Sequence, residues 1–237
     1  MPEQQPYRLK SVVKEDFDKL QNYDAGRDMY YFQRRFIRIL KELPENKNAA
    51  ILDFGGGSGL FTSNLMKKGY TNISLLDLSP VQIKQAKDKG LTKVYCGDEN
   101  YLIKHFPKNT FDIIFMADVI EHLEHPVETL HKINTVLKPG GKLILTFPNP
   151  LWVPIFNILG DIGLKLKGKD NKIYLRTMMP QLRPSFTLHS FEGHMLVSKL
   201  PKPILSFFEK VERILPRSFR RWYGLLSIAI LEKTPAA

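Results

Sequence analysis

The sequence predicts a single α/β domain with a doubly wound, mostly parallel β-sheet. Segments of strand length alternate with helical segments along residues 46–150, which is the order that βαβ units require. The first predicted strand leads directly into a glycine-rich turn, as in sheets that bind a ligand at their carboxyl edge. The chain of 237 residues has 43% hydrophobic residues, enough for one full core.

Cysteine content and hydropathy bear on the compartment. The only cysteine is Cys96, so the sequence predicts neither a disulfide framework nor a zinc site built from cysteines. The first ten residues contain no apolar core of a signal peptide, and no apolar run reaches the roughly 18 residues of a membrane span. We therefore expect a cytoplasmic protein, either soluble or peripheral at a membrane.

Positive charge is concentrated in the last third of the chain. The net charge of +11 divides into +3 for residues 1–150 and +8 for residues 151–237. Such an excess can bind nucleic acid, anionic lipid or an anionic substrate, and it can also serve solubility alone. Charge by itself leaves these alternatives open.

Two helical segments precede the first predicted strand. Residues 1–22 are expected to be a mobile polar lead-in with a short helix over residues 12–20. Over residues 29–43, apolar side chains recur at helical spacing opposite a basic face, which predicts a helix that covers the sheet. Pro44 and the polar residues after it end this helix.

The first strand and its turn are the run ILDFGGGSG at residues 51–59. Glycines alternate at Gly55, Gly57 and Gly59, where a turn close to a ligand has no room for a Cβ and can require positive φ. The dinucleotide spacing G-x-G-x-x-G fails in either register, because no glycine stands at the third position. The helix after the turn would direct its first N–H groups at the same ligand.

The second strand supplies an acid at the edge where the glycine turn lies. Residues 73–76 form a short, largely apolar strand that ends at Asp77, twenty residues beyond Gly57. An acid at the end of the neighbouring parallel strand can accept both hydroxyls of a ribose. Ser79 and Pro80 then predict the N-cap and first turn of a helix.

Three further strands complete the βαβα order. Residues 93–96 form the third strand, followed by Asp98, which could meet an adenine amino group or simply cap the next helix. The nearly continuous apolar run of residues 111–116 predicts a fourth strand buried on both faces. A helix over residues 127–137, the turn LKPGG and a fifth strand, KLILTFPNP, follow.

Residues 51–150 resemble the class I S-adenosylmethionine-dependent methyltransferases, in particular the small-molecule branch similar to the ubiquinone-biosynthesis O-methyltransferases. The resemblance rests on D-x-G-x-G-x-G at residues 53–59, the acid of the second strand, GD after the third, DVIEHL and LKPGG. It implies a Rossmann-like sheet of seven strands whose last strand is antiparallel. It also implies that S-adenosylmethionine lies across the carboxyl ends of the strands and that the insertion after strand five builds the acceptor pocket.

The resemblance implies a cofactor role for residues that match the family motifs. Asp53 and the loop glycines would lie near the methionine moiety, Asp77 at the ribose and Asp98 at the adenine. The complete set of predicted cofactor-binding residues is Asp53, Gly55, Gly57, Gly59, Asp77, Leu78, Asp98 and Ala117. The whole chain would be one domain, with a helical cover over residues 1–45, a cofactor half over residues 46–150, and the acceptor insertion and last strands over residues 151–237.

Methyl transfer needs alignment of the acceptor and exclusion of water more than a covalent residue. Asp118, Glu121 and His122 would share one face of a helical turn, which makes Asp118 and His122 catalytic candidates. The ubiquinone O-methyltransferases ligate a divalent metal with a matching acid-x-x-Glu-His pattern, but metal-independent relatives carry similar residues. Mg²⁺ is therefore considered but not favoured, and a helix-capping role for the segment is the plainer alternative.

The insertion over residues 151–194 is apolar and aromatic and then basic, which favours a hydrophobic or lipid-like acceptor. His189 lies where relatives bring a histidine toward the active site, although a loop histidine often has no such role. Residues 204–215 form an apolar helical stripe of the kind that usually packs in a core, and residues 225–231 predict the seventh strand.

Competing functions remain after these motifs. A methyltransferase of RNA or protein would use the basic last third, but the fourth strand ends in ADVI, without the Asn/Asp-Pro-Pro-aromatic signature, and nucleic acid is not favoured. A nicotinamide oxidoreductase or a non-catalytic nucleotide-binding module conflicts with the glycine spacing. A further hypothesis is docking at an anionic membrane, supported by LWVPIFNIL beside Lys165, Lys167 and Lys169 and by the stripe that ends in RSFRRW. The alternative is that both segments pack on the sheet.

Overall fold

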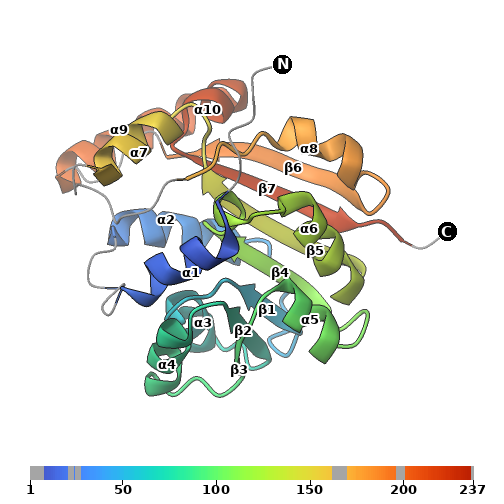
Figure 1. Cartoon of the computed structure of the whole chain (residues 1–237). Coiled ribbons are helices and arrows are strands. Elements are labelled where there is room, and N and C mark those ends of the chain that lie inside the picture. The colour runs from blue at the N-terminus through green and yellow to red at the C-terminus, as the bar shows by residue number, and fades with distance from the viewer. Residues whose placement is uncertain (1–7, 21–23, 25–27, 162–169, 196–200, 236–237) are drawn as a thin grey trace.

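The computed structural model describes residues 8–20, 24, 28–161, 170–195 and 201–235. Its centre is a seven-stranded sheet in the order β3-β2-β1-β4-β5-β7-β6, with helices on both faces (Figure 1). The strands are β1 Ile51–Phe54, β2 Ile73–Asp77, β3 Val94–Cys96, β4 Phe111–Ala117, β5 Leu137–Pro148, β6 Phe186–His194 and β7 Leu226–Lys233. Strand β7 is antiparallel to both neighbours and the other pairings are parallel, which confirms the predicted fold class.

The helices divide between the two faces of the sheet. They are α1 Lys10–Asp18, α2 Met29–Leu40, α3 Leu60–Lys67, α4 Pro80–Asp88, α5 Glu99–His105, α6 Pro126–Val136, α7 Val153–Asp161, α8 Leu175–Leu182, α9 Lys202–Ile214 and α10 Arg217–Tyr223. Helices α2 and α3 cover one face, where Phe32, Phe36 and Phe61 pack near Phe115 of β4. Helices α6 and α8 contribute to the core on the other face, where Leu130 and Leu182 are fully buried.

The strand order creates the crevice that positions the site. Strands β2 and β3 lie on one side of β1, and β4 and β5 lie on the other, so the order reverses between β1 and β4. Ligands bind at such a switch point, outside the carboxyl ends of the strands. All four residues of β1 are buried because it lies between strands and beneath helices on both faces.

The prediction of a turn at LKPGG is wrong, because these residues belong to strand β5. The structure begins β5 at Leu137, which pairs with Phe111, and the register then shifts so that Lys142 pairs with Ile113. The extra residues form a bulge, in which Gly140 has φ +72°. The segment is therefore part of a paired strand with a bulge, which turn residues alone do not reveal.

The predicted end of the insertion, at residue 194, is also wrong. Strand β6 begins at Phe186, so the end of the expected insertion belongs to the sheet and pairs with β7. Between β5 and β6 the structure has α7 and α8, while Lys165, Lys167 and Lys169 lie outside the described residues. Among the residues described, no helix has both the length and the hydropathy needed to cross a membrane.

Candidate functional site

A pocket opens at the carboxyl ends of β1, β2 and β4. Its wall includes Gly55 and Gly57 of the glycine loop, and Ala117 at the end of β4. Four of its lining residues come from α1, which crosses above these strand ends in Figure 1: Lys10, Val13, Lys14 and Phe17. The pocket therefore joins the predicted cofactor edge to an N-terminal helix that forms its roof.

The glycine loop has the backbone shape that the sequence predicts. Gly55, Gly57 and Gly59 have φ values of +74°, +55° and +79°, which side chains disfavour. A Cβ at Gly55 would lie 2.5 Å from Cγ2 of Val119, so the loop packs directly against the segment after β4. Gly59 does not line the pocket; it is the N-cap of α3, and a Cβ there would lie 2.3 Å from Cδ1 of Leu91.

Asp77 is fixed between the loop and the next helix. The backbone N–H of Gly57 donates to its Oδ2 at 2.7 Å, and the N–H of Ser79 donates to Oδ1 at 2.9 Å. Ser79 is the N-cap of α4 as predicted, since its hydroxyl accepts from the N–H of Gln82. Asp77 and Leu78 both line the pocket, which places an oriented carboxylate where the sequence expected a ribose to bind.

Asp53 lies beneath the loop. Its side chain is buried, and its Oδ2 accepts a hydrogen bond from the hydroxyl of Thr62 in α3 at 2.8 Å. A Cβ at Gly56 would lie 2.8 Å from the Asp53 carboxyl carbon, so the carboxylate supports the glycine loop from below. Direct contact between Asp53 and a cofactor stays a prediction.

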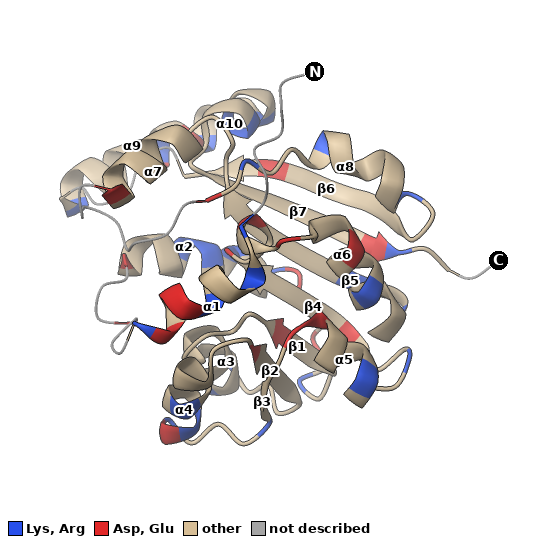
Figure 2. Cartoon of the chain, in the orientation of Figure 1, with Lys and Arg blue, Asp and Glu red and all other residues tan. Residues whose placement is uncertain are grey.

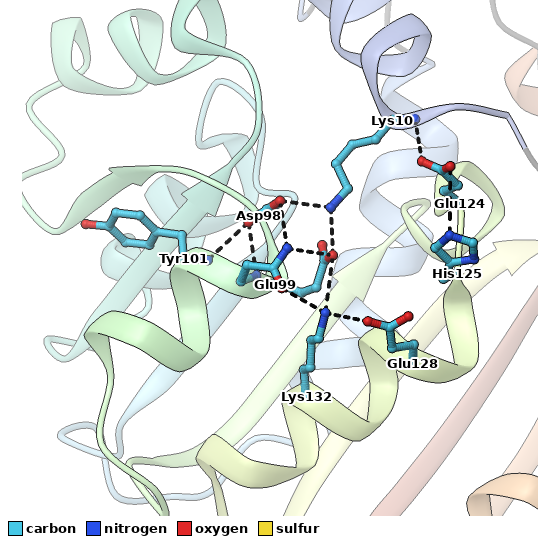
Figure 3. Close-up of polar contacts among 9 residues, drawn as sticks. Lys10, Asp98, Glu99, Tyr101, Glu124, His125, Glu128 and Lys132 are labelled. Atoms are coloured by element: carbon cyan, nitrogen blue, oxygen red, sulfur yellow. Dashed lines mark hydrogen bonds and ion pairs between the residues drawn. The ribbon is translucent and has the colours of Figure 1, made fainter.

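Asp98 takes part in a charged cluster that closes the pocket. Its Oδ1 accepts from the N–H groups of Asn100 and Tyr101, which caps α5, and its Oδ2 accepts from Nζ of Lys10 at 2.8 Å (Figure 3). Burial opposes ionisation of Asp98, but the hydrogen bonds from Lys10 and the Tyr101 N–H outweigh it and lower its pKa to about 2. Lys10 also bonds the buried Glu99 at 2.6 Å.

The roof helix α1 is attached at both ends. At its start, the N–H of Lys10 donates to Glu124 at 3.0 Å, in addition to the contacts of its ammonium group. At its end, the Ser79 hydroxyl donates to Asp18 at 2.5 Å, and the Gln82 amide donates to the carbonyl of Phe17 at 3.3 Å. The predicted helix exists, but the prediction missed its place over the pocket.

One local signal was available for this role of α1. Val13 and Phe17 are spaced by one helical turn, so a helix would present both on one face. Their partners lie far along the chain, however, and nothing in the local sequence identifies that surface. Arg35 of α2 also lines the pocket and was missed for the same reason.

Asp118 has a positive φ of +59° immediately after β4. Its carboxylate forms an ion pair with the buried guanidinium of Arg35 and accepts a hydrogen bond from the Thr146 hydroxyl at 3.3 Å. Because α2, β4 and β5 each supply one member of this group, Asp118 ties the pocket wall to two strands and a covering helix. The expected helical turn is therefore absent at Asp118 and begins later, as the short 3₁₀ turn Ile120–His122.

His122 lines the pocket beneath the roof helix. Its ring meets Phe17 of α1 edge-on with centroids 5.6 Å apart, and its Nε2 lies 3.9 Å from Oδ1 of the buried Asp170. The backbone around Asp170 is held in place, since its N–H donates to the side-chain carbonyl of Asn157 in α7 at 2.9 Å. The insertion thus contacts the pocket residue His122 through Asp170.

The acid-x-x-Glu-His segment does not have the arrangement of a metal site. Asp118 pairs with Arg35, His122 faces Asp170, and Glu121 is buried with its backbone carbonyl accepting from Asn171. Within the described parts of the chain, no three His, Cys, Asp or Glu side chains converge as metal ligands. The residues that match the metal pattern therefore do not fit a divalent ion in this geometry.

His189 is not brought to the pocket. It lies on β6 at the irregularity between Leu188 and Ser190, and its side chain is 55% exposed. Its Nδ1 lies 3.9 Å from Glu232 of β7, at the opposite edge of the sheet from β3. The described geometry gives no support to its expected catalytic role.

The pocket combines oriented acids, a glycine cradle and a roof in which Val13 and Phe17 stand beside Lys10 and Lys14. Asp77 offers a fixed carboxylate, while Phe54, Leu76 and Leu78 supply apolar lining beside it. Such a site suits a ligand with a polyhydroxylated part and a flat apolar part. His122 and Asp118 line the same pocket.

A family model described as a methyltransferase domain matches residues 26–200. A ubiquinone/menaquinone biosynthesis C-methyltransferase of Haemophilus ducreyi is 30% identical over 187 residues, which cover 66% of this chain and 71% of that protein. A malonyl-[acyl-carrier protein] O-methyltransferase of Ilyobacter polytropus is 23% identical over 210 residues, with coverage of 82% and 75%.

Solved structures show the same fold across most of the chain. The [4+2]-cyclase SpnF superposes with a TM-score of 0.70 at 16% identity, covering 98% of this chain and 99% of that one. A SAM-dependent methyltransferase from Thermotoga maritima superposes with a TM-score of 0.68 at 17% identity, covering 93% and 99%. At these identities the likeness concerns the fold alone.

Proposed function

Because the chain belongs to the class I S-adenosylmethionine-dependent methyltransferases, we propose that its pocket holds this cofactor for methyl transfer to a small, hydrophobic or lipid-like acceptor. The observation that carries the cofactor assignment is the carboxylate of Asp77, oriented by Gly57 and Ser79 at the end of β2. An acid in this position can accept both ribose hydroxyls. The left-handed Gly55 and Gly57 beside it leave room for close approach of the rest of the cofactor.

The acceptor class is supported by the apolar wall of the pocket. Phe17, Val119 and Leu123 line it near His122 and offer apolar surface to an acceptor, beside the polar Asp118, Glu124 and His125. Relatives named for quinone biosynthesis and for a malonyl carrier protein agree with a small acceptor group. A lipid-like acceptor implies that the enzyme works at the periphery of a membrane.

The chemistry of the transfer divides between cofactor and protein. Bound S-adenosylmethionine supplies a methyl group on a positively charged sulfur, already activated toward a nucleophile. The chain supplies alignment and exclusion of water: α1 closes the pocket with Val13 and Phe17, and the Arg35–Asp118 pair fixes the inner wall. We propose that His122 accepts a proton from the acceptor where the acceptor carries one.

Calorimetry tests the cofactor assignment directly. S-adenosylmethionine and its demethylated product should bind and raise the melting temperature, as any ligand selective for the folded state does. NADH, titrated in the same way, should give no heat of binding. Binding of NADH without binding of S-adenosylmethionine would overturn the proposal.

The acceptor is tested with labelled S-adenosylmethionine. Label should transfer into a total lipid extract or a set of quinone precursors, and bulk tRNA should remain unlabelled. Each reaction is run with Mg²⁺ and with EDTA; equal rates are expected, since Asp118 and His122 are engaged elsewhere. Transfer only into tRNA would replace the hydrophobic acceptor with a nucleic acid.

A further inference from the structure

Helix α9 turns its acidic residues toward the body of the protein and leaves several apolar residues in solvent. Its acids point inward: Glu212 is buried and accepts from Arg34 at 2.7 Å, and Glu209 lies 3.2 Å from the same guanidinium. Glu212 also accepts the N–H of Met195 at 3.0 Å and lies 3.3 Å from His194. These contacts orient α9 so that the face carrying Glu209 and Glu212 lies against Arg34.

The apolar side chains of α9 are exposed as a consequence. Ile204, Phe207 and Ile214 are 43%, 60% and 82% exposed, at the i, i+3 and i+10 positions of one helical face. The sequence suggested core packing for this stripe. Leu205 is buried and Phe208 and Val211 are half-buried, so that interpretation is wrong for Ile204, Phe207 and Ile214.

Helix α10, the next helix along the chain, also exposes apolar side chains and is attached to the body of the protein. The Asn149 amide donates to the carbonyl of Trp222 at 3.0 Å, and the indole of Trp152 donates to that of Tyr223 at 3.1 Å. A Cβ at Gly193 would lie 1.8 Å from the Arg220 carbonyl oxygen, so α10 lies directly on β6. In this position its aromatic side chains Phe219, Trp222 and Tyr223 are 41%, 71% and 49% exposed.

We infer that α9 and α10 form a docking surface for an anionic lipid bilayer, consisting of Ile204, Phe207, Ile214, Phe219, Trp222 and Tyr223. Exposed apolar patches on a soluble domain mark interaction sites, and aromatic rings suit the bilayer interface. Residues 201–223 contain six basic residues, all of them exposed except the half-buried Arg220, and both acids of the segment face Arg34. Basic residues on α9 and α10 are visible in Figure 2.

The positive charge of α9 and α10 favours an anionic bilayer as the partner of this surface. Basic side chains around an apolar patch match acidic headgroups around acyl chains, and both attractions add. Nucleic acid would use the arginines and aromatic rings but would gain nothing from the exposed aliphatic Ile204 and Ile214. A second copy of this chain would bring the same positive charge to the interface, which opposes a dimer through this face.

The docking surface lies at the same edge of the sheet as the pocket. Helix α10 leads into β7 at Leu226, which pairs with Pro148 at the carboxyl end of β5 and with His194 at the end of β6. A bilayer held there would present its lipids toward the edge at which the pocket opens (Figure 1). The inference rests on the proposed function only in that a lipid-like acceptor would enter from the bound membrane.

Flotation of the full chain with vesicles tests the surface. We expect binding to phosphatidylcholine vesicles that contain phosphatidylglycerol, increasing with the anionic fraction and weakened by salt. The double variant Phe207→Ser, Trp222→Ser should lose at least tenfold in affinity, since two exposed apolar anchors are removed. Ile37→Ser, at a 53% exposed site on α2, is the matched control and should bind like the original protein.

The charged contribution is tested separately. Arg213→Gln with Arg217→Gln should weaken binding about 20-fold, from roughly fivefold per basic residue near an anionic surface. Lys67→Gln with Lys84→Gln removes the same charge from α3 and α4, and should leave the affinity within about twofold. Melting temperature and the heat of S-adenosylmethionine binding, measured on every variant, confirm that the fold is intact.

Two outcomes would overturn the docking surface. One is equal recovery of unbound protein with neutral and anionic vesicles at low salt. The other is a dimer in sedimentation that Phe207→Ser, Trp222→Ser converts to monomer without any vesicle binding, which would assign the surface to a second copy. Vesicle binding without binding of S-adenosylmethionine would retain the docking surface and reject the proposed function, so the two failures are distinct.

Discussion

The cofactor edge and the last third of the chain use acidic residues in opposite ways. At the cofactor edge, Asp77 and Asp98 accept backbone N–H groups from neighbours two or three residues away in sequence or from the adjacent loop. In the last third, Glu212 reaches Arg34, which is 178 residues away. Local hydrogen bonds orient side chains toward a ligand, whereas this long-range ion pair orients an entire helix and thereby determines which of its faces meets solvent.

The largest expected effect, on the free energy of unfolding, comes from removing Glu212 from its contacts with Arg34 and His194. Glu212→Ala should destabilise the protein by about 3 kcal/mol, because Arg34 and His194 then share a buried site without their main acceptor. Glu209→Ala is the control: its side chain is 30% exposed and its contact with Arg34 is longer, so about 1 kcal/mol or less is expected. Urea unfolding measures both. Equal effects would mean that the orientation of α9 does not depend on Glu212.

The next largest effect concerns cofactor binding by the locally oriented carboxylate of Asp77. Asp77→Ala should weaken S-adenosylmethionine binding about 100-fold, since two hydroxyls lose a charged acceptor worth at least roughly 1.5 kcal/mol each. Calorimetry gives the dissociation constant. Asp88→Ala, at an exposed residue at the end of α4, should leave that constant unchanged. An unchanged constant in Asp77→Ala would show that the oriented carboxylate is not the ribose acceptor.

The success of the sequence-based prediction follows the same division. Strand β1, the left-handed loop glycines and the Ser79 cap were predictable because each depends on residues within a few positions. The exposed face of α9 was not, since an apolar stripe at helical spacing normally indicates burial and only Arg34 reverses it. The position of His189 on an edge strand likewise depends on pairing with β7, and local sequence does not determine it.

The pocket contains residues that sequence motifs predicted and residues that they did not. Asp77, Leu78, Asp98 and Ala117 were predicted from motifs and line it. The α1 residues that line it, and Asp170 beside His122, were not predicted, because they come to the site by packing across the fold. Motifs therefore predict the floor of the site, and tertiary contacts supply its roof.

The pH dependence of stability tests the state of His194, which lies beside Glu212. The pKa of His194 is lowered to about 4, first by burial and then by the positive charge of Arg34, despite the carboxylate of Glu192. In the unfolded chain the histidine titrates near 6.5, so it takes up a proton before the folded state does. The stability due to neutral His194 is thus complete above that pH and is lost as the pH falls toward 4.

The expected loss is about 2 kcal/mol on going from roughly pH 7 to pH 5, from 1.36 kcal/mol per pH unit. Urea unfolding at the two values measures it, and His194→Gln should remove that part of the pH dependence. His125→Gln changes a 70% exposed ring and should not. The same pH dependence in His194→Gln as in the original protein would reject a neutral, buried His194.

The smallest effect concerns the long-range contact that Lys10 makes at the cofactor edge. Lys10 joins α1 to Asp98 and Glu99, so Lys10→Ala should loosen the roof and weaken S-adenosylmethionine binding about fivefold, or roughly 1 kcal/mol. Lys19→Ala is the control, because that residue forms an exposed ion pair with Glu15 at the other end of α1. Stopped-flow release of the cofactor should be faster in Lys10→Ala and unchanged in the control. Tighter binding in Lys10→Ala would instead show that Lys10 occupies the Asp98 carboxylate at the expense of the adenine, and the roof would then be a competitor of the cofactor instead of its cover.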